Sequence, residues 1–209
     1  MQIRRTLALM AATALGITAL AACSSSTDSA PSPGQSVSTA PMTQGSPTDI
    51  AFAQSMIPHH QQAIEMADLA LDPQAGASPQ VQQLARQIKA AQDPEIEQMT
   101  QWLQAWGAPA AMPGVSDASA VAGMDHSGHD MGGMTMSGMM TAEQMQELEQ
   151  ARGTDFDQMW LTMMIAHHEG AISMAQQAQA SNSSQVTTLT DAIITGQQQE
   201  ITTMQQLLD

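Results

Sequence analysis

A duplicated block of twelve residues is the feature that most constrains how this chain can fold. Both copies read Met-Ile-x-His-His-x-x-Ala-Ile-x-Met-Ala, the first starting at Met56 and the second, 108 positions later, at Met164. Apolar and small residues recur in each copy at spacings of three and four, which predicts an amphipathic helix whose buried face passes through or beside the histidines. The two blocks hold four of the six histidines of the chain: His59, His60, His167 and His168.

Each block is followed by a second repeated helical pattern, whose inward positions include two polar residues. Counting back from the turn between the first two helices brings His59 level with Gln92, and Met56 level with Glu95. A buried polar pair should have a partner. Two αα-hairpins with the same inward face most simply pack as a four-helix up-down bundle. The polar inward residues of the two hairpins are Gln92, Glu95, Gln197 and Glu200.

Capping and turn residues predict where the helices begin and end. A Ser or Thr side chain can accept a hydrogen bond from a backbone N–H of the first turn, whereas Gly and Pro favour helix ends and turns. The inward face of the last helix is expected to run from Val186 to Leu208. The expected signals, in chain order, are a cap at Ser46, a turn over 72–79, a helix over about 80–106, a capping box at Thr141, a stop at Gly153, a cap by Thr154 with Asp157 and a turn over 181–183.

The N-terminal residues are typical of a bacterial lipoprotein signal peptide. Arg4 and Arg5 precede an apolar stretch, and a leucine and two alanines lead into Cys23, as in a lipobox. This pattern predicts that residues 1–22 are removed and that Cys23 is lipidated, which would anchor the chain to the outer side of a membrane; the alternative is an ordinary signal peptide. Residues 23–45 are rich in Ser, Thr, Pro, Gly and Ala and are expected to form a flexible tether.

The remaining residues, 46–209, are expected to form one four-helix domain. It would consist of a first hairpin over 46–106, a linker over 107–140, and a short helix plus the second hairpin over 141–209. Residues 123–140 of the linker contain six Met and two His among many glycines, which predicts a disordered segment unless metal orders it. A linker of low complexity or a set of oxidisable methionines is the alternative. Its candidate ligands are Met124, His126, His129, Met131, Met134 and Met136.

Composition limits the kinds of fold and partner. The formal charge is -15 with only five Lys and Arg, so binding to nucleic acid is excluded by the lack of cations to replace phosphate counterions. Hydrophobic residues make up 43% of the chain but aromatic residues only 2%, which favours an aliphatic core built from helices. Cys23 is the only cysteine, so the chain can form no internal disulfide. An all-α protein of the cell envelope is the expected class.

Methionine and histidine lie together on the predicted helices in a pattern that suits a soft metal ion. Met56 and His60 are four residues apart, as are Met164 and His168, and this spacing places both side chains on one helix face. A thioether favours Cu(I), or Ag(I), over harder ions, and imidazole suits several transition metals. The alternative is that these methionines only pack the core. The candidate ligands are Met56, His59, His60, Met66, Met163, Met164, His167, His168 and Met174.

The acidic and amide residues of the second helix in each hairpin are expected to support the ligands. Glu95 and Glu200 could bind metal directly, but with soft ligands nearby we favour a role in orienting a histidine through its other ring nitrogen. Gln92 and Gln197 are expected to share this role. No residue is predicted to be catalytic.

The two hairpins resemble a bacterial family known as domain of unknown function 305. The resemblance rests on the block over 164–175 and on Gln197-x-x-Glu200-Ile201-x-x-Met204 in the second half; the first half carries the same motifs, with Gln62 where the family usually has Gly. The resemblance implies a ferritin-like helical bundle and a role in copper binding and copper tolerance outside the cytoplasm.

Three classes of function remain open on these grounds. The first is a lipid-anchored protein that sequesters Cu(I) or passes it to a copper-transfer partner. The second is a ferritin-like oxidoreductase, against which stands the lack of a Glu-x-x-His motif in either block. The third is a helical envelope scaffold that binds no metal.

Overall fold

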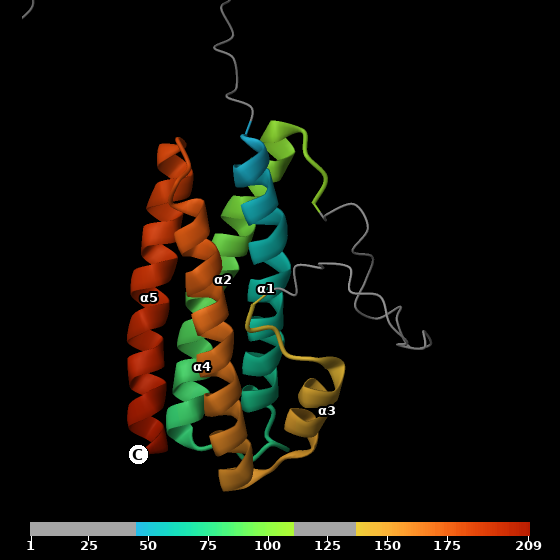
Figure 1. Cartoon of the computed structure of the whole chain (residues 1–209). Coiled ribbons are helices and arrows are strands. Elements are labelled where there is room, and N and C mark those ends of the chain that lie inside the picture. Colours follow the sequence, from blue (N-terminus) through green and yellow to red (C-terminus); the bar gives the residue numbers. More distant parts are fainter. Residues whose placement is uncertain (1–44, 111–136) are drawn as a thin grey trace, which may run out of the picture. The chain divides into compact units, whose positions relative to one another are not determined.

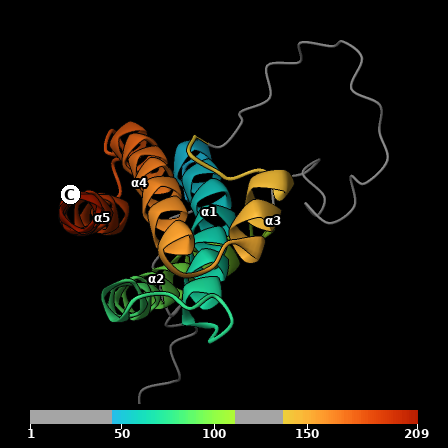
Figure 2. The same cartoon turned by 90° about the horizontal axis from the view of Figure 1, so that it is seen from below.

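The computed structural model describes residues 45–110 and 137–209, all of which belong to one compact unit. All regular secondary structure in these residues is helical, which confirms the predicted all-α class (Figure 1). Four long helices lie side by side, and the short α3 lies outside them, against α1 (Figure 2). The helices are α1 (Pro47–Leu71), α2 (Pro79–Trp106), α3 (Ala142–Gln150), α4 (Gly153–Ala178) and α5 (Ser184–Leu208).

Hydrogen bonds between the helix ends fix the direction of each helix. At one end of the bundle the amide of Gly153, at the start of α4, donates to the carbonyl of Ala75 in the α1–α2 turn at 2.8 Å. At the other end the Ser181 hydroxyl, in the α4–α5 turn, donates to Asp49 near the start of α1. Therefore α2 and α4 run parallel to one another, and so do α1 and α5. Each hairpin runs up and down as predicted, but one long crossover joins α2 to α4, as in ferritin-like bundles, and makes these two helices parallel.

Most of the predicted caps are present. Ser46 forms a reciprocal capping box with Asp49, and Thr141 forms one with Gln144. The predicted cap of α4 is wrong, because α4 starts at Gly153 with Arg152 as its N-cap and without a side-chain hydrogen bond to the cap. The Asp157 carboxylate instead accepts from the backbone amide of Ser78 across the bundle, at 3.1 and 3.2 Å.

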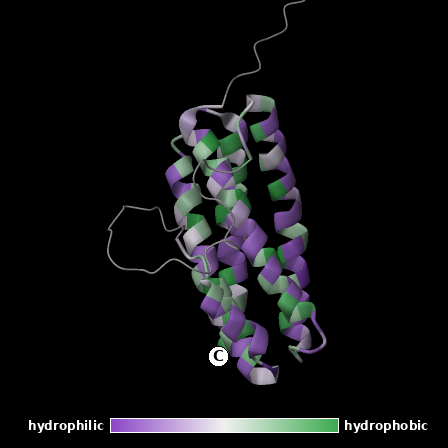
Figure 3. Ribbon diagram, turned by 90° about the vertical axis from the view of Figure 1, so that its right-hand side faces the viewer, coloured by the Kyte–Doolittle hydropathy of each residue, from purple (hydrophilic) through white to green (hydrophobic). Residues whose placement is uncertain are grey.

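The core consists of two apolar clusters with a polar layer between them. One cluster includes Leu84 and Trp160, and the other includes Phe52 and Trp102. Hydrophobic and hydrophilic residues alternate along each helix, as a bundle with one buried face per helix requires (Figure 3). Between the clusters, each long helix contributes two polar residues. This polar layer comprises His59, His60, Gln92, Glu95, His167, His168, Gln197 and Glu200.

Burial follows the predicted inward faces except at the C-terminus. Val186, Ile193 and Met204 of α5 are buried, but Leu208 is 41% exposed, so the prediction that it faces the core is wrong. Leu207, in the same last turn of α5, is also exposed. In the described ranges, no helix combines the length and the apolar character needed to cross a membrane.

Candidate metal centre

The polar layer brings the two histidine pairs together, one from α1 and one from α4. The rings of His59 and His167 contact each other directly, with centroids 3.8 Å apart and planes tilted by 42°. The ring of His168 lies 6.4 Å from that of His167. All four imidazoles are at most 1% exposed. The two sequence repeats therefore bring their histidines into one central cluster.

Each outer histidine is held by the glutamate of its own hairpin. Nε2 of His60 lies 2.8 Å from Oε2 of Glu95, and Nε2 of His168 lies 2.7 Å from Oε2 of Glu200. Because a carboxylate oxygen accepts, Nε2 carries the proton in both bonds and Nδ1 is the atom left for a ligand. The helix register differs from the sequence-based prediction, which placed Glu95 level with Met56: Glu95 reaches His60, one helical turn further along α1.

The central pair, His59 and His167, is buried too deeply to carry charge easily. Burial lowers the pKa of His59 to about 3, an effect that the neighbouring His60 and His168 reinforce and that the hydrogen bond to the carbonyl of Ser137 opposes. Burial also lowers the pKa of His167 well below its usual value, with further contributions from His59 and His168. Both rings are therefore neutral near pH 7, which is the form in which imidazole binds a metal.

Several buried nitrogen and oxygen atoms of the polar layer have no hydrogen-bond partner in the described protein. They are Nδ1 of all four histidines, Nε2 of His167, both amide atoms of Gln92 and Oε1 of Gln197. Within the part of the chain that the structure describes, the prediction that Gln92 has a polar partner is therefore wrong. Unpaired buried polar atoms are rare because each is destabilising. The ring nitrogens and amide oxygens among them are atoms that a metal ion would satisfy.

Thioethers approach the polar layer along the same helices. Met56 and Met164, each one turn before the second histidine of its block, are fully buried on opposite sides of the layer. Met66 is also fully buried, within the cluster that contains Trp160, and its carbonyl accepts from the indole of that residue at 2.8 Å. Met163 and Met174 are partly buried beside the core. The six candidate ligands of the linker and Cys23 lie outside the described residues.

The side chains of the polar layer do not already surround one point. In residues 45–110 and 137–209, no three His, Cys, Asp or Glu side chains are arranged to hold one metal ion. The rings of His59 and His167 contact each other and leave no room for an ion between them. A site limited to His and carboxylate ligands would therefore need these rings to rotate. A soft ion that takes few ligands would require less rearrangement of these side chains, because one or two imidazoles and a buried thioether can supply its coordination.

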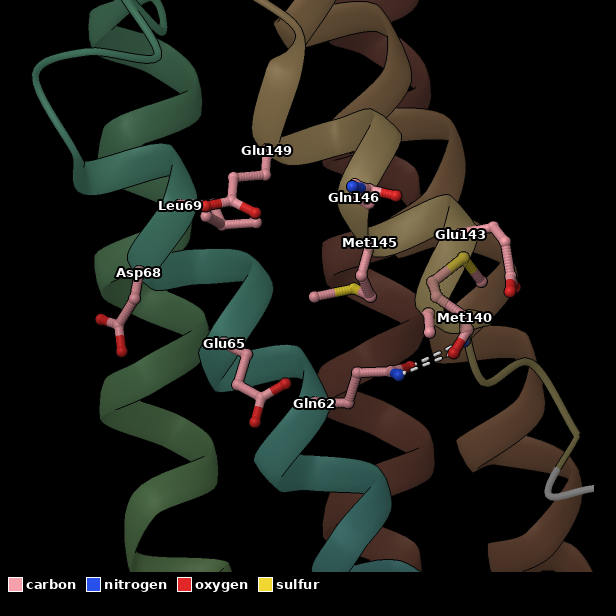
Figure 4. Close-up of a pocket in the computed structure, with 10 residues that line it drawn as sticks. Gln62, Glu65, Asp68, Leu69, Met140, Glu143, Met145, Gln146 and Glu149 are labelled. Carbon is pink, nitrogen blue, oxygen red and sulfur yellow. Dashed lines mark hydrogen bonds between the residues drawn. The ribbon is translucent and has the colours of Figure 1, made fainter. Parts of the chain in front are cut away.

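The sequence did not predict the role of the residues just before α3. The carbonyl of Ser137 accepts from Nε2 of His59 at 3.0 Å. Next to it, the Gln62 side chain exchanges two hydrogen bonds with the main chain of Met140 (Figure 4). An open groove between α1 and α3 begins at Gln62 and Met140, and acidic residues that include Glu65 and Glu149 line it further along. The only available signal was that Gln62 departs from the repeat.

Comparison with known proteins gives a consistent family assignment. The family model "Domain of unknown function (DUF305)" matches residues 49–208. A DUF305 fragment from Deinococcus radiodurans is 27% identical, with a TM-score of 0.65, and the match covers 78% of this chain and 97% of that one. A candidate secreted DUF305 protein from Streptomyces coelicolor is 29% identical, with a TM-score of 0.64, and the match covers 77% and 91%. Comparison with curated proteins gives no match.

A further solved relative, CopM, is described by the metal it holds. Its Cu(II)-bound form is 34% identical to this chain, with a TM-score of 0.58, and the match covers 77% of this chain and 95% of CopM. Its Cu(I)-bound form is 30% identical, with a TM-score of 0.57 and coverage of 76% and 94%. CopM has also been solved with silver.

Proposed function

Because the chain belongs to the DUF305 family over residues 49–208, we propose that it is an extracytoplasmic copper-binding protein that holds Cu(I) at the polar layer. The observation that carries the proposal is the cluster of four buried imidazoles, each with an unpaired Nδ1. That relatives of similar fold are described with Cu(I), Cu(II) and silver supports the choice of metal. The function is binding rather than catalysis.

Within this site we assign the ligands to histidine nitrogens and to the thioethers of Met56 and Met164. The neutral central rings do not need to lose a proton before they bind, and soft sulfur ligands favour Cu(I) over Zn(II). Glu95 and Glu200 orient the outer imidazoles through Nε2 and leave Nδ1 for the metal. Met66, Met163 and Met174 lie in or beside the apolar clusters that flank this donor set, and Gln92 and Gln197 lie in the polar layer itself.

The proposed place of action is the outer face of a membrane, where Cys23 would carry the lipid anchor. The signal-peptide pattern before Cys23 supports this location, as does the solved relative described as a candidate secreted protein. We assign the Met and His residues of the linker, from Met124 to Met136, to low-specificity collection of the ion. The bundle would then sequester the ion or pass it to a copper-transfer protein.

The decisive experiment is anaerobic competition for Cu(I) against a chromogenic chelator. The chain starts at Ser24, which keeps every described residue and removes the Cys23 thiol. A His60→Ala, His168→Ala variant is compared with a deletion of residues 123–136, which stops short of the residues that contact the helices. Loss of a tight site in the histidine variant supports the proposal. Loss only in the deletion would move binding to the linker, and no binding by the intact chain would refute a copper function.

Two conservative glutamate variants test the orienting role of the carboxylates. Glu95→Gln and Glu200→Gln keep a hydrogen-bond acceptor near Nε2 but remove its charge, so we expect each to weaken Cu(I) binding by about 10- to 100-fold. The two losses should be similar, because the two bonds have nearly the same length. A Met145→Leu variant, in α3 away from the polar layer, serves as the control and should bind like the parent chain. Unchanged affinity in both glutamine variants would contradict the assigned role.

A further inference from the structure

Residues 137–140, here called the strap, lie across the polar layer between α1 and α4. On the α1 side, the strap is held by a complete pair of hydrogen bonds. Nε2 of Gln62 donates to the carbonyl of Met140 at 2.8 Å, and the amide of Met140 donates to Oε1 of Gln62 at 2.7 Å (Figure 4). The Gln62 side chain thus satisfies both backbone groups of one residue, as a neighbouring strand would.

On the α4 side, the strap is held by close contact between two backbones. A Cβ atom on Gly170 would lie 1.8 Å from the carbonyl oxygen of Ser137 and 2.9 Å from Cα of Gly138. A Cβ on Gly138 would lie 2.5 Å from the carbonyl oxygen of Ala166, and Gly138 has a φ of +84°. No side chain fits at either position without moving the strap.

Gln62 and Gly170 occupy the same position in the two repeats, three residues after the first histidine of each block. The repeats differ here, and the strap uses both residues: it bonds to the amide in one copy and fills the space left by the absent side chain in the other. Gln62 is 9% exposed, and both ends of its amide are occupied. The one position where Gln62 departs from the repeat is therefore the position that holds the strap on α1.

The strap also supplies His59 with a partner like those of the outer histidines. Nε2 of His60 and of His168 meets a glutamate oxygen, and Nε2 of His59 meets the carbonyl oxygen of Ser137 at 3.0 Å. A carbonyl can only accept, so this contact requires the proton of His59 to be on Nε2. No glutamate or strap carbonyl meets a ring nitrogen of His167 in the described protein; its ring interacts with the backbone of His59 instead.

We propose that the strap, clamped by Gln62 and Gly170, is a positioning segment that fixes His59 as the Nε2–H tautomer and reserves its Nδ1 for the metal. This inference rests on the proposed copper function. It makes the central pair unequal: His59 has one nitrogen available as a ligand, whereas the strap does not fix the tautomer of His167. Gln62 and Gly170 act through His59 and do not themselves bind the ion.

The test compares two glycine substitutions that differ only in what the new methyl group meets. Gly170→Ala forces the strap away from α4. Gly196→Ala, in α5, has nothing within 4 Å of the new Cβ and provides the same gain in helix propensity. Gln62→Met removes both hydrogen bonds to Met140 at similar volume. All variants are made in the chain from Ser24.

Two measurements on the metal-free chain decide whether the clamp exists. Amide hydrogen exchange of Met140 should accelerate on the order of tenfold or more in Gly170→Ala and Gln62→Met, and not in Gly196→Ala. Ring ¹⁵N shifts should report a single Nε2–H tautomer for His59 in the parent chain and a mixture in the two strap variants. Unchanged Met140 exchange would overturn the clamp. Faster exchange with an unchanged His59 tautomer would overturn the positioning role.

Copper binding then tests whether the tautomer of His59 matters to the metal. Cu(I) affinity should fall by about tenfold in Gly170→Ala and Gln62→Met and stay at the parent value in Gly196→Ala. Equal affinity in all four chains, despite a changed tautomer, would overturn His59 Nδ1 as a ligand. If the parent chain binds no Cu(I), the proposed function fails, and the ligand assignment fails with it; the exchange and tautomer data still decide the clamp.

Discussion

Lowering the pH should destabilise the metal-free bundle through His59. In the unfolded chain this residue has a pKa of about 6.5 and binds a proton as the pH falls, whereas burial lowers its pKa in the folded state to about 3. The unfolded state therefore binds more protons, and the free energy of unfolding decreases as the pH is lowered from about 6.5 to about 3. The stabilising contribution is fully present above about pH 7 and is lost progressively below it.

The size of the effect follows from the two pKa values. Between pH 7.5 and pH 4.5, protonation of one unfolded histidine lowers the free energy of unfolding by about 2.7 kcal/mol. His167 adds a loss in the same direction, since burial lowers its pKa as well. A loss of this size is a large part of the roughly 5–15 kcal/mol by which a domain is stable. It should lower the urea midpoint by about 1–3 M.

The assay is urea unfolding in the presence of a chelator, at pH 7.5, 6.5, 5.5 and 4.5, for the parent chain and for His59→Gln. The variant removes one titrating group, so its loss of stability over this range should be smaller by about 2.7 kcal/mol. Carboxylates titrate in both chains and largely cancel in the difference. Parallel curves for the two chains would refute the reasoning, because His59 would then titrate alike when folded and unfolded.

Three further substitutions test buried hydrogen bonding in the same unfolding assay. Trp160→Phe removes the indole donor to the buried carbonyl of Met66 and should destabilise the bundle by about 1–3 kcal/mol; no loss would show that this bond is replaced or unimportant. Gln92→Met removes two buried amide atoms without partners and should stabilise the metal-free chain by about 1–2 kcal/mol. Gln197→Met should stabilise it less, because Gln197 has one buried atom without a partner, Oε1, and Gln92 has two; the reverse order would contradict this account.

The helices of the bundle could be predicted because their signals are local. Capping at Ser46 and Thr141 and the spacing of apolar residues depend on neighbours in sequence, and both predictions are confirmed. Thr154 is not a cap because α4 already begins at Gly153, and the carboxylate of Asp157, its predicted partner, accepts a bond from the other hairpin. The local pattern had assigned Asp157 to the helix end, but its side chain makes a tertiary contact with Ser78 instead.

The candidate site could be predicted less completely, because its geometry depends on how the hairpins meet. The sequence indicated that Glu95 and Glu200 should orient histidines, and each forms a hydrogen bond with a different histidine. It could not indicate that His59 and His167 contact each other, since that distance is set by the packing of α1 on α4. It also left the number of sites open, whereas the bundle brings both histidine pairs into one layer.

Duplication alone would make the two halves of the polar layer equivalent, and the single crossover prevents this. The chain passes from α2 to α4 only once, so its strap can lie over one histidine of the central pair and not over both. The strap lies at His59, and position 62 has a side chain that holds it while position 170 has none. A symmetric pair of repeats thus becomes an asymmetric site through a contact that neither repeat contains. It follows that replacing His59 and replacing His167 should affect metal binding unequally, although the repeats align them as equivalents.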